Sequence, residues 1–189
     1  SRCVEIAKKY GVELLVCSSL NRNSGTMVRE KTKMEKMLIS GVAADKNVAK
    51  IRVAGLGNDP ESTFRLLNLL DRNNLNIDVM IQSLGKDGTK SVSFTVAKPD
   101  MLRTIDVLND NKDSLGIKKL DYDENVAKIS VIGAGVRSHS GVAAKMFGAL
   151  ANAGINTEMI TTSEIRITAL INEAYADQAM RAIHETFLE

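Results

Sequence analysis

The stretch VAKIRVAGLG occupies residues Val48–Gly57, and the closely similar stretch VAKISVIGAG occupies Val126–Gly135, beginning 78 residues later. A second pair of matching stretches follows, NNLNIDVMIQS at Asn73–Ser83 and NAGINTEMITTS at Asn152–Ser163. Similarity of a chain to itself at a fixed spacing is the signature of a repeated structural unit. The chain therefore contains an internal duplication, and a site built on one copy should have a counterpart on the other.

Both copies predict the same order of elements, βαββα. An alternating strand (Ala49, Ile51 and Val53; Ile129 and Val131) leads through a glycine-containing loop into an amphipathic helix. Gly85-Lys86-Asp87-Gly88 is a strong hairpin turn signal between the next two strands. The remaining predicted elements of the first copy are the helix with Phe64, Leu67 and Leu70, the turn Asn73–Asn74, strands Ile77–Ile81 and Ser91–Ala97, and helix Pro99–Asn109. Those of the second copy are the helix with Val142, Met146 and Leu150, the turn Ala153–Gly154, strands Glu158–Thr162 and Ile165–Ile171, and helix Ala174–Phe187.

One more strand would complete each unit as βαββαβ, an α+β ferredoxin-like sandwich with an antiparallel sheet and helices on one face. Ile117–Tyr122 can close the first unit. The second unit has no strand left after its last helix, so we expect the segment Met37–Asp45 to supply it. The first unit would then be inserted in the second.

The N-terminal residues do not fit the repeat. They predict a helix at Arg2–Tyr10 with Gly11 as its C-cap, a buried strand at Glu13–Cys17 and a loop at Asn21–Gly25. Such an αβ fragment without its parent sheet suggests that an upstream domain has been removed.

The composition narrows the class of protein. The chain has 189 residues, is 44% hydrophobic and 25% charged, and carries a net charge of +2, so a globular protein is expected, with no nucleic acid or membrane as partner. Aromatic residues make up 4% and Trp is absent, which disfavours base stacking. Neither a signal peptide nor an apolar run long enough to span a bilayer is evident. Cys3 and Cys17 do not make a disulfide framework and are expected to be reduced in a cytoplasmic protein.

Several stretches together resemble the C-terminal regulatory part of bacterial aspartate kinase, including the short regulatory subunit that some bacteria make from the same gene. They span almost the whole chain and read RCVEIAKKYGVELLVCSSLNRNSGT, ISGVAADKNVAKIRV, NIDVMIQS, KISVIGAGVRSHSGVAAKMFGAL and NTEMITTSEIRITALI. The resemblance implies two ACT domains, one inserted in the other, and feedback control by lysine, threonine or both. It divides the chain into a remnant of the kinase domain at 1–30, the first ACT domain at 48–122, and the second at 31–47 plus 123–189.

The resemblance also implies what lies elsewhere in the family. Aspartate kinases phosphorylate aspartate with ATP and Mg, using a Lys-Phe-Gly-Gly-Thr phosphate loop and aspartate-binding residues upstream of the regulatory part. The sequence has none of these motifs, so we expect this chain to hold no cofactor and to be inactive alone. Its expected partners are the kinase domain or catalytic subunit and a second copy of the chain, since ferredoxin-like units expose edge strands.

A free amino acid presents a carboxylate, which suits a helix N-terminus, and an ammonium, which suits carbonyls or an acidic side chain. Both features meet where the loop GNDPESTF enters the first helix beside the strand beginning at Asn76. Asp59 is the expected N-cap and Pro60 the first helical residue. Asp78 could pair with a lysine ammonium, and Gln82 could bond a threonine hydroxyl. By resemblance, Asn58, Glu61, Ser62, Thr63, Ile77, Asp78 and Gln82 match effector-binding positions, and the capping residue Asp59 is a further candidate for effector binding.

Glu61 is a departure, because family members often have Gly at this position; its carboxylate could repel that of the ligand or point to solvent. In the second unit, Ser138 or His139 would cap the helix after GVRSHSGV, and Asn156 and Thr157 open the next strand. By resemblance, Asn156 and Thr157 approach an effector held between the first unit of one chain and the second unit of its partner.

Each of these features has a simpler interpretation. Asp59 and Ser138 could be helix caps only, Asp78 could be a solvated strand residue, and His139 lacks a nucleophile or metal partner for catalysis. The GAGVRS stretch lacks the third glycine of a dinucleotide fingerprint, because position 138 is Ser. The leading hypothesis is an amino-acid sensor. A dimerisation module without a ligand is the alternative, whereas a complete small transferase and an RNA-binding platform have little support.

Overall fold

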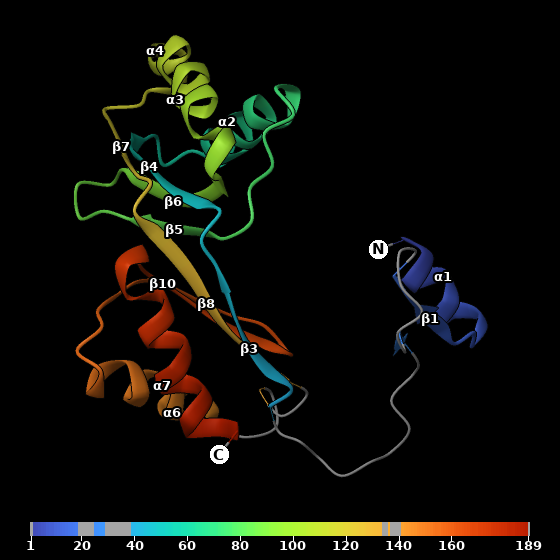
Figure 1. The fold of residues 1–189 in the computed structure, drawn as a ribbon. Coiled ribbons are helices and arrows are strands. Elements are labelled where there is room, and N and C mark those ends of the chain that lie inside the picture. Colours follow the sequence, from blue (N-terminus) through green and yellow to red (C-terminus); the bar gives the residue numbers. More distant parts are fainter. Residues whose placement is uncertain (1, 19–24, 29–38, 134–135, 137–140, 189) are drawn as a thin grey trace. The chain divides into compact units, whose positions relative to one another are not determined.

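The duplicated segments form two four-stranded antiparallel sheets in the computed structural model, which describes residues 2–18, 25–28, 39–133, 136 and 141–188. Helices cover one face of each sheet (Figure 1), so the predicted α+β ferredoxin-like class is confirmed. We call the sheet with strand order β5-β6-β4-β7 and its helices the first domain, and the sheet with order β3-β8-β10-β9 and its helices the second domain.

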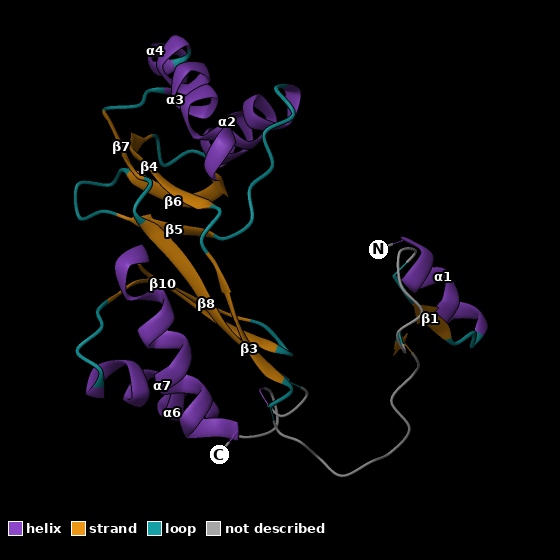
Figure 2. Ribbon diagram, viewed as in Figure 1, coloured by secondary structure: helices purple, strands orange, loops and turns teal. Residues whose placement is uncertain are grey.

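The first domain is a continuous stretch of chain. Its elements are β4 (Val48–Leu56), α2 (Pro60–Arg72), β5 (Met80–Leu84), β6 (Lys90–Ala97), the 3-10 turn η1 (Lys98–Asp100), α3 (Met101–Asp110), α4 (Lys112–Leu115) and β7 (Lys119–Asp123). Strand β4 lies between β6 and β7, and β5 pairs with β6 at the edge. All neighbouring strands are antiparallel. The strands of this sheet lie together beneath helices α2 and α3 (Figure 2).

The second domain takes its fourth strand from before the first domain. Its elements are β3 (Gly41–Asp45), β8 (Val126–Ile132), α6 (Gly141–Asn152), β9 (Thr157–Thr162), β10 (Arg166–Asn172), the 3-10 turn η2 (Glu173–Tyr175) and α7 (Ala176–Leu188). Strand β3 pairs antiparallel with β8, with Asp45 opposite Lys128. The first domain therefore lies between two segments of the second domain along the chain.

Residues Ser1–Lys36 form a separate unit. Its helix α1 (Arg2–Tyr10) has the predicted bounds, and Gly11 ends it at a φ of +63°, which suits glycine. The prediction of a buried strand at Glu13–Cys17 is wrong. Strand β1 (Leu14–Val16) pairs with β2 (Thr26–Val28), and Leu15 and Val16 are each 59% exposed. A two-stranded ribbon with one short helix offers too little cover to bury them.

Each domain buries one face of its sheet beneath its helices. Ile51 and Val53 of β4 point into one core, and Ile129 and Val131 of β8 point into the other. All four side chains are fully buried, as the alternating pattern predicted. Burying a side chain of this size stabilises the fold by about 1.5–3 kcal/mol relative to leaving it exposed.

Local chain geometry shapes the C-terminal end of β4. A β-bulge interrupts the pairing of β4 and β6 between Ala54 and Leu56, and the residue between them is Gly55 with a φ of +88°. A side chain there would be strained by the backbone angle and would collide with Lys118.

The predicted hairpin turn between β5 and β6 is confirmed, because the Gly85 amide donates to the carbonyl of Thr89 at 2.7 Å.

Strand β5 begins later than predicted, at Met80 instead of Ile77. The reason lies in Thr95 of β6, whose hydroxyl accepts a hydrogen bond from the Val79 amide at 3.1 Å. The amide of Asp78 donates to the Thr95 carbonyl at 3.1 Å. A side-chain bond thus replaces part of the regular ladder, and the segment before Met80 leaves the strand conformation.

A third apolar cluster joins the two domains across the faces that carry no helices. Its buried members are Val48, Val79, Val126, Met159 and Leu170. Val48 and Val126 are equivalent residues of the two copies, and so are Val79 and Met159. The interface therefore has approximate twofold symmetry between the domains.

Candidate functional site

The start of helix α2 is capped by the residue predicted for this role. Asp59 accepts hydrogen bonds from the amides of Glu61 at 3.0 Å and Ser62 at 2.9 Å, and from the Ser62 hydroxyl. The hydroxyl bond is the largest cause of a lowered pKa of Asp59. Asp59 thus accepts from the two helix amides that the sequence analysis expected a ligand carboxylate to bind. A ligand carboxylate here must therefore bind other groups or displace Asp59.

Two of the predicted site residues meet beside this cap. The hydroxyl of Thr63 in α2 donates to the amide oxygen of Gln82 in β5 at 2.6 Å. Asn58 and Glu61 are exposed next to them. Because the Glu61 side chain is exposed, it can lie away from a ligand carboxylate, as one of the two interpretations of this residue requires. Polar side chains from the loop, the helix and the strand therefore gather at this end of the domain.

Sequence reasoning missed Lys90. This residue begins β6, and its ammonium donates to the Asp59 carbonyl at 2.7 Å. It brings a positive charge to the start of α2, where a carboxylate would need one. No motif distinguishes Lys90 from the other lysines, and the only available signal was its place directly after the hairpin turn.

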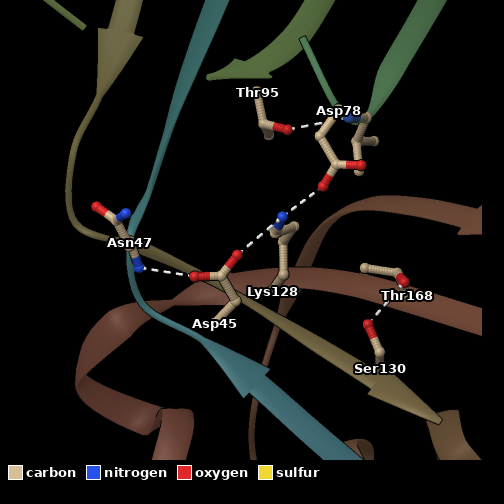
Figure 3. Close-up of polar contacts among 8 residues, drawn as sticks. Asp45, Asn47, Asp78, Thr95, Lys128, Ser130 and Thr168 are labelled. Carbon is tan, nitrogen blue, oxygen red and sulfur yellow. Dashed lines mark hydrogen bonds and ion pairs between the residues drawn. The ribbon is translucent and has the colours of Figure 1, made fainter. Parts of the chain in front are cut away.

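Asp78 belongs to a different group of side chains. Ile77 packs against the core of the first domain, but Asp78 forms an ion pair with Lys128 of the second domain. Lys128 also contacts Asp45, its neighbour across the sheet, at 3.0 Å. Figure 3 shows the Lys128 ammonium between the two carboxylates. The structure therefore divides the predicted first site into a Thr63–Gln82 part and an Asp78 part.

We call Asp45, Asp78 and Lys128 the triad, and electrostatics favour the charged forms of its members Asp45 and Lys128. Burial lowers the pKa of Lys128, but the hydrogen bonds to Asp78 and Asp45 outweigh burial and raise it above its usual value. Burial likewise raises the pKa of Asp45, but bonds from Lys128 and from the Asn47 amide at 2.9 Å outweigh burial and lower it. An opposite charge at short range stabilises the ionised form of each group.

The triad lines two pockets. One, of about 570 Å³, lies over the helix-free face of the second sheet. Its floor includes the hydroxyls of Ser130 and Thr168, which are bonded to each other at 2.8 Å, and Arg166 is part of its wall. The other, of about 300 Å³, is lined by Asn76 and Ile77 as well as the triad. Asp78 is therefore accessible to a small polar molecule from either side.

The equivalent segment of the second domain makes the reciprocal contact. Asn156 is exposed and Thr157 is the half-buried first residue of β9. The next residue, Glu158, forms an ion pair with Lys50 of the first domain. Ser138 and His139 lie outside the described residues, as does most of the GAGVRS loop.

Metal-binding groups and membrane-spanning helices can both be looked for in the described part of the chain. No group of three His, Cys, Asp or Glu side chains there is placed to hold a metal ion. Nor does any helix of that part have the length and apolar character needed to cross a membrane.

A model of the ACT domain family matches residues 129–187. A crystal structure of aspartokinase alpha and beta subunits is 41% identical, with a TM-score of 0.75 over 80% of this chain and 99% of that chain. The ligand-free regulatory subunit of aspartate kinase from Thermus thermophilus is 33% identical, with a TM-score of 0.75 over 79% of this chain and 99% of that one. The chain therefore belongs to the aspartate kinase family and corresponds to its regulatory ACT-domain part.

Longer relatives match as well. An aspartokinase of Pseudomonas aeruginosa is 38% identical over 189 residues, which is 98% of this chain and 46% of that protein. The chain spans about half the length of the curated relatives that it matches.

Proposed function

We propose that this chain senses lysine, threonine or both on behalf of an aspartate kinase, and that the bound amino acid lowers the activity of the kinase domain. The observation that carries the proposal is the Thr63–Gln82 pair beside the start of α2. It supports the proposal because the half-buried Thr63 and the exposed Gln82 bring polar groups of a helix and a strand together beside the loop.

The site residues take separate roles in this proposal. Lys90 attracts the carboxylate of the amino acid, because the backbone donors of α2 are used by Asp59. Gln82 and Thr63 exchange their mutual hydrogen bond for bonds to the ligand. Asp78, in the separate part of the site beside Lys128, receives an ammonium. Asn58, Glu61, Ser62 and Ile77 border the site, and Asn156 and Thr157, with Ser138 and His139, form the corresponding region of the second domain.

A second copy of the chain completes the site. Strands β5 and β7 are the edges of the first sheet, and β3 and β9 are the edges of the second. Exposed edges are commonly covered by pairing with another chain. We expect sheets to pair side by side in a homodimer, with the effector between the first domain of one chain and the second domain of its partner.

The action on the kinase requires more than binding. A ligand shifts an equilibrium only if its affinity differs between the two states. The amino acid must therefore favour the domain arrangement that inhibits an attached kinase domain or catalytic subunit, which would carry the ATP, Mg and aspartate sites. An E. coli aspartokinase III, which is 22% identical and shares the fold, has been crystallised with lysine and aspartate.

Isothermal titration of the chain with lysine, with threonine, and with each in the presence of the other tests the proposal. We expect saturable binding, weakened about tenfold or more by Asp78→Ala or Gln82→Ala. Matched controls are Asp106→Ala on α3 and Gln178→Ala on α7, which should bind as the unaltered chain does. Mutual enhancement of the two ligands would indicate concerted control, because coupling is reciprocal.

The alternative is a dimerisation module without a ligand. A chain that is folded and dimeric but gives no binding heat with either amino acid would contradict the sensor and support this module. A monomer at all ligand concentrations, measured by light scattering, would contradict the dimer.

A further inference from the structure

Lys128 forms two ion pairs, and the one with Asp78 connects the two domains and does not follow from strand pairing within a sheet. Its pairing with Asp45 follows from strand register, since the two residues are opposite each other on β8 and β3. Its pairing with Asp78 crosses to the other domain. The Lys128 side chain is 16% exposed, whereas that of Asp78 is 57% exposed. The carboxylate is therefore open to solvent while the ammonium is not.

The carboxylates of Asp45 and Asp78 differ in how many of their oxygens have a hydrogen-bond or ion-pair partner. Asp45 accepts from the Asn47 amide with one oxygen and from Lys128 with the other. Asp78 contacts Lys128 through Oδ2, and among the described residues its Oδ1 has no partner. Asp78 can thus take another cation, whereas both oxygens of Asp45 are occupied.

The charges of the triad leave room for one more cation. Two carboxylates and one ammonium sum to a net charge of −1, and both pockets open onto them. An incoming ammonium would meet an accessible, partly neutralised carboxylate at Asp78. Lys128 would keep a partner in Asp45 if it lost Asp78.

We propose that Lys128 is an intramolecular competitor for Asp78, and that an amino-acid ammonium binding to Asp78 leaves Lys128 with Asp45 and releases one ion pair between the domains. The inference rests on the proposed function, because it takes Asp78 as part of the ligand site. It adds the residue that opposes the ligand, and it gives the ligand a direct effect on how firmly the two domains are held together.

The first test compares Lys128→Met with unaltered chain by titration with lysine and with norleucine, which has the same carbon skeleton without the side-chain ammonium. We expect Lys128→Met to bind lysine roughly three- to fivefold more tightly, in line with the modest strength of a partly exposed ion pair. Tightening for lysine alone would assign its side-chain ammonium to Asp78. Tightening for both ligands would assign the α-ammonium.

Two matched variants separate competition from a general change in charge. Lys50→Met removes the same charge from the equivalent strand position, where the partner is Glu158, and should leave affinity unchanged. Lys128→Arg keeps the charge and should bind within about twofold of the unaltered chain. Equal tightening by Lys50→Met and Lys128→Met would overturn the inference.

Asp45→Asn tests the same idea with the opposite sign and does not depend on the folding of Lys128→Met. It retains an acceptor for the Asn47 amide but removes the second carboxylate of Lys128. The ammonium is then held by Asp78 alone, so we expect lysine to bind about two- to fivefold more weakly.

The outcomes distinguish the two proposals. If the unaltered chain binds an amino acid but Lys128→Met and Asp45→Asn bind it equally well, the inference fails and the sensor stands. If only Lys128→Met binds, Lys128 blocks Asp78 completely, so the competition is supported but the unaltered chain is not the sensor. If neither the unaltered chain nor any folded variant binds, both proposals are overturned.

Discussion

The two domains share a fold and a strand register but differ where they meet. Lys50 and Lys128 are equivalent residues; in the described part of the chain Lys50 pairs with Glu158 alone, whereas Lys128 pairs with both Asp78 and Asp45. The equivalent of Asp45 is Asp123, which faces Lys50 across the sheet without completing such a triad. Duplication therefore preserved the backbone, while the interdomain contacts became unequal.

The same inequality appears at two uncharged positions. Opposite Ile51 lies Phe94, and opposite the equivalent Ile129 lies Ala169. Opposite Lys50 lies Thr95, and opposite Lys128 lies Leu170. The first domain thus has a large side chain in its core and a hydroxyl on the face toward the other domain. The second domain has a small side chain in its core and an apolar one on that face. Equal folds can distribute volume and polarity differently.

The largest expected effect comes from the core of the first domain. Phe94→Ala should lower the free energy of unfolding by about 3–5 kcal/mol, because Phe94 is almost fully buried and its removal leaves a cavity in the first core. Urea unfolding should show the loss. A loss below about 1 kcal/mol would mean that the first core can close as the second does.

The next effect concerns the interface hydroxyl. Thr95→Val keeps the shape but removes the acceptor of the Val79 amide, and should cost about 1–3 kcal/mol in unfolding free energy. Leu170→Val at the equivalent position is the control for changed apolar packing. Hydrogen exchange at the Val79 amide should accelerate in Thr95→Val only, and unchanged exchange would contradict the role of the hydroxyl.

A smaller effect is expected from the one-to-one ion pair. Lys50→Met should cost no more than about 1 kcal/mol, whereas Lys128→Met leaves two carboxylates without a cation and should cost more. Thermal unfolding monitored by circular dichroism can rank them. The reverse ranking would show that the triad contributes less than its geometry suggests.

The smallest effect is expected on acidification. Because the pKa of Asp45 is lowered in the folded chain, its stabilising contribution is present above the unfolded value of about 3.9 and is lost as pH falls through the folded value. The raised pKa of Lys128 contributes below about 10.4 and is lost only above that pH. The contributions of Asp45 and Lys128 should therefore be unchanged between about pH 5 and 9.

Asp45→Asn provides the control for this pH dependence. The decline of the melting temperature between about pH 5 and 3 should be less steep in Asp45→Asn than in the unaltered chain. Identical slopes would show that Asp45 does not contribute to acid sensitivity.

The candidate site was only partly predictable. Asp59 as the cap and the proximity of Thr63 to Gln82 follow from local spacing, since a cap acts within one turn and a loop–helix–strand unit keeps its ends close. Lys90 and Lys128 were missed, because each reaches its partner through tertiary contacts that no short motif encodes. The buried strand predicted near the N-terminus was wrong for a related reason: burial depends on what covers a strand, not on its apolar residues alone.

By itself the sequence determined the duplication, the alternating strands, the helices and the need for a strand from outside the second repeat. These properties are local or periodic, and periodicity of side chains directly sets which face of an element is buried. Only the tertiary structure decided which charges meet between the domains. Two equivalent lysines with similar neighbours in sequence acquired one and two carboxylate partners, because ion pairing depends on distances of a few ångströms between segments far apart in the chain.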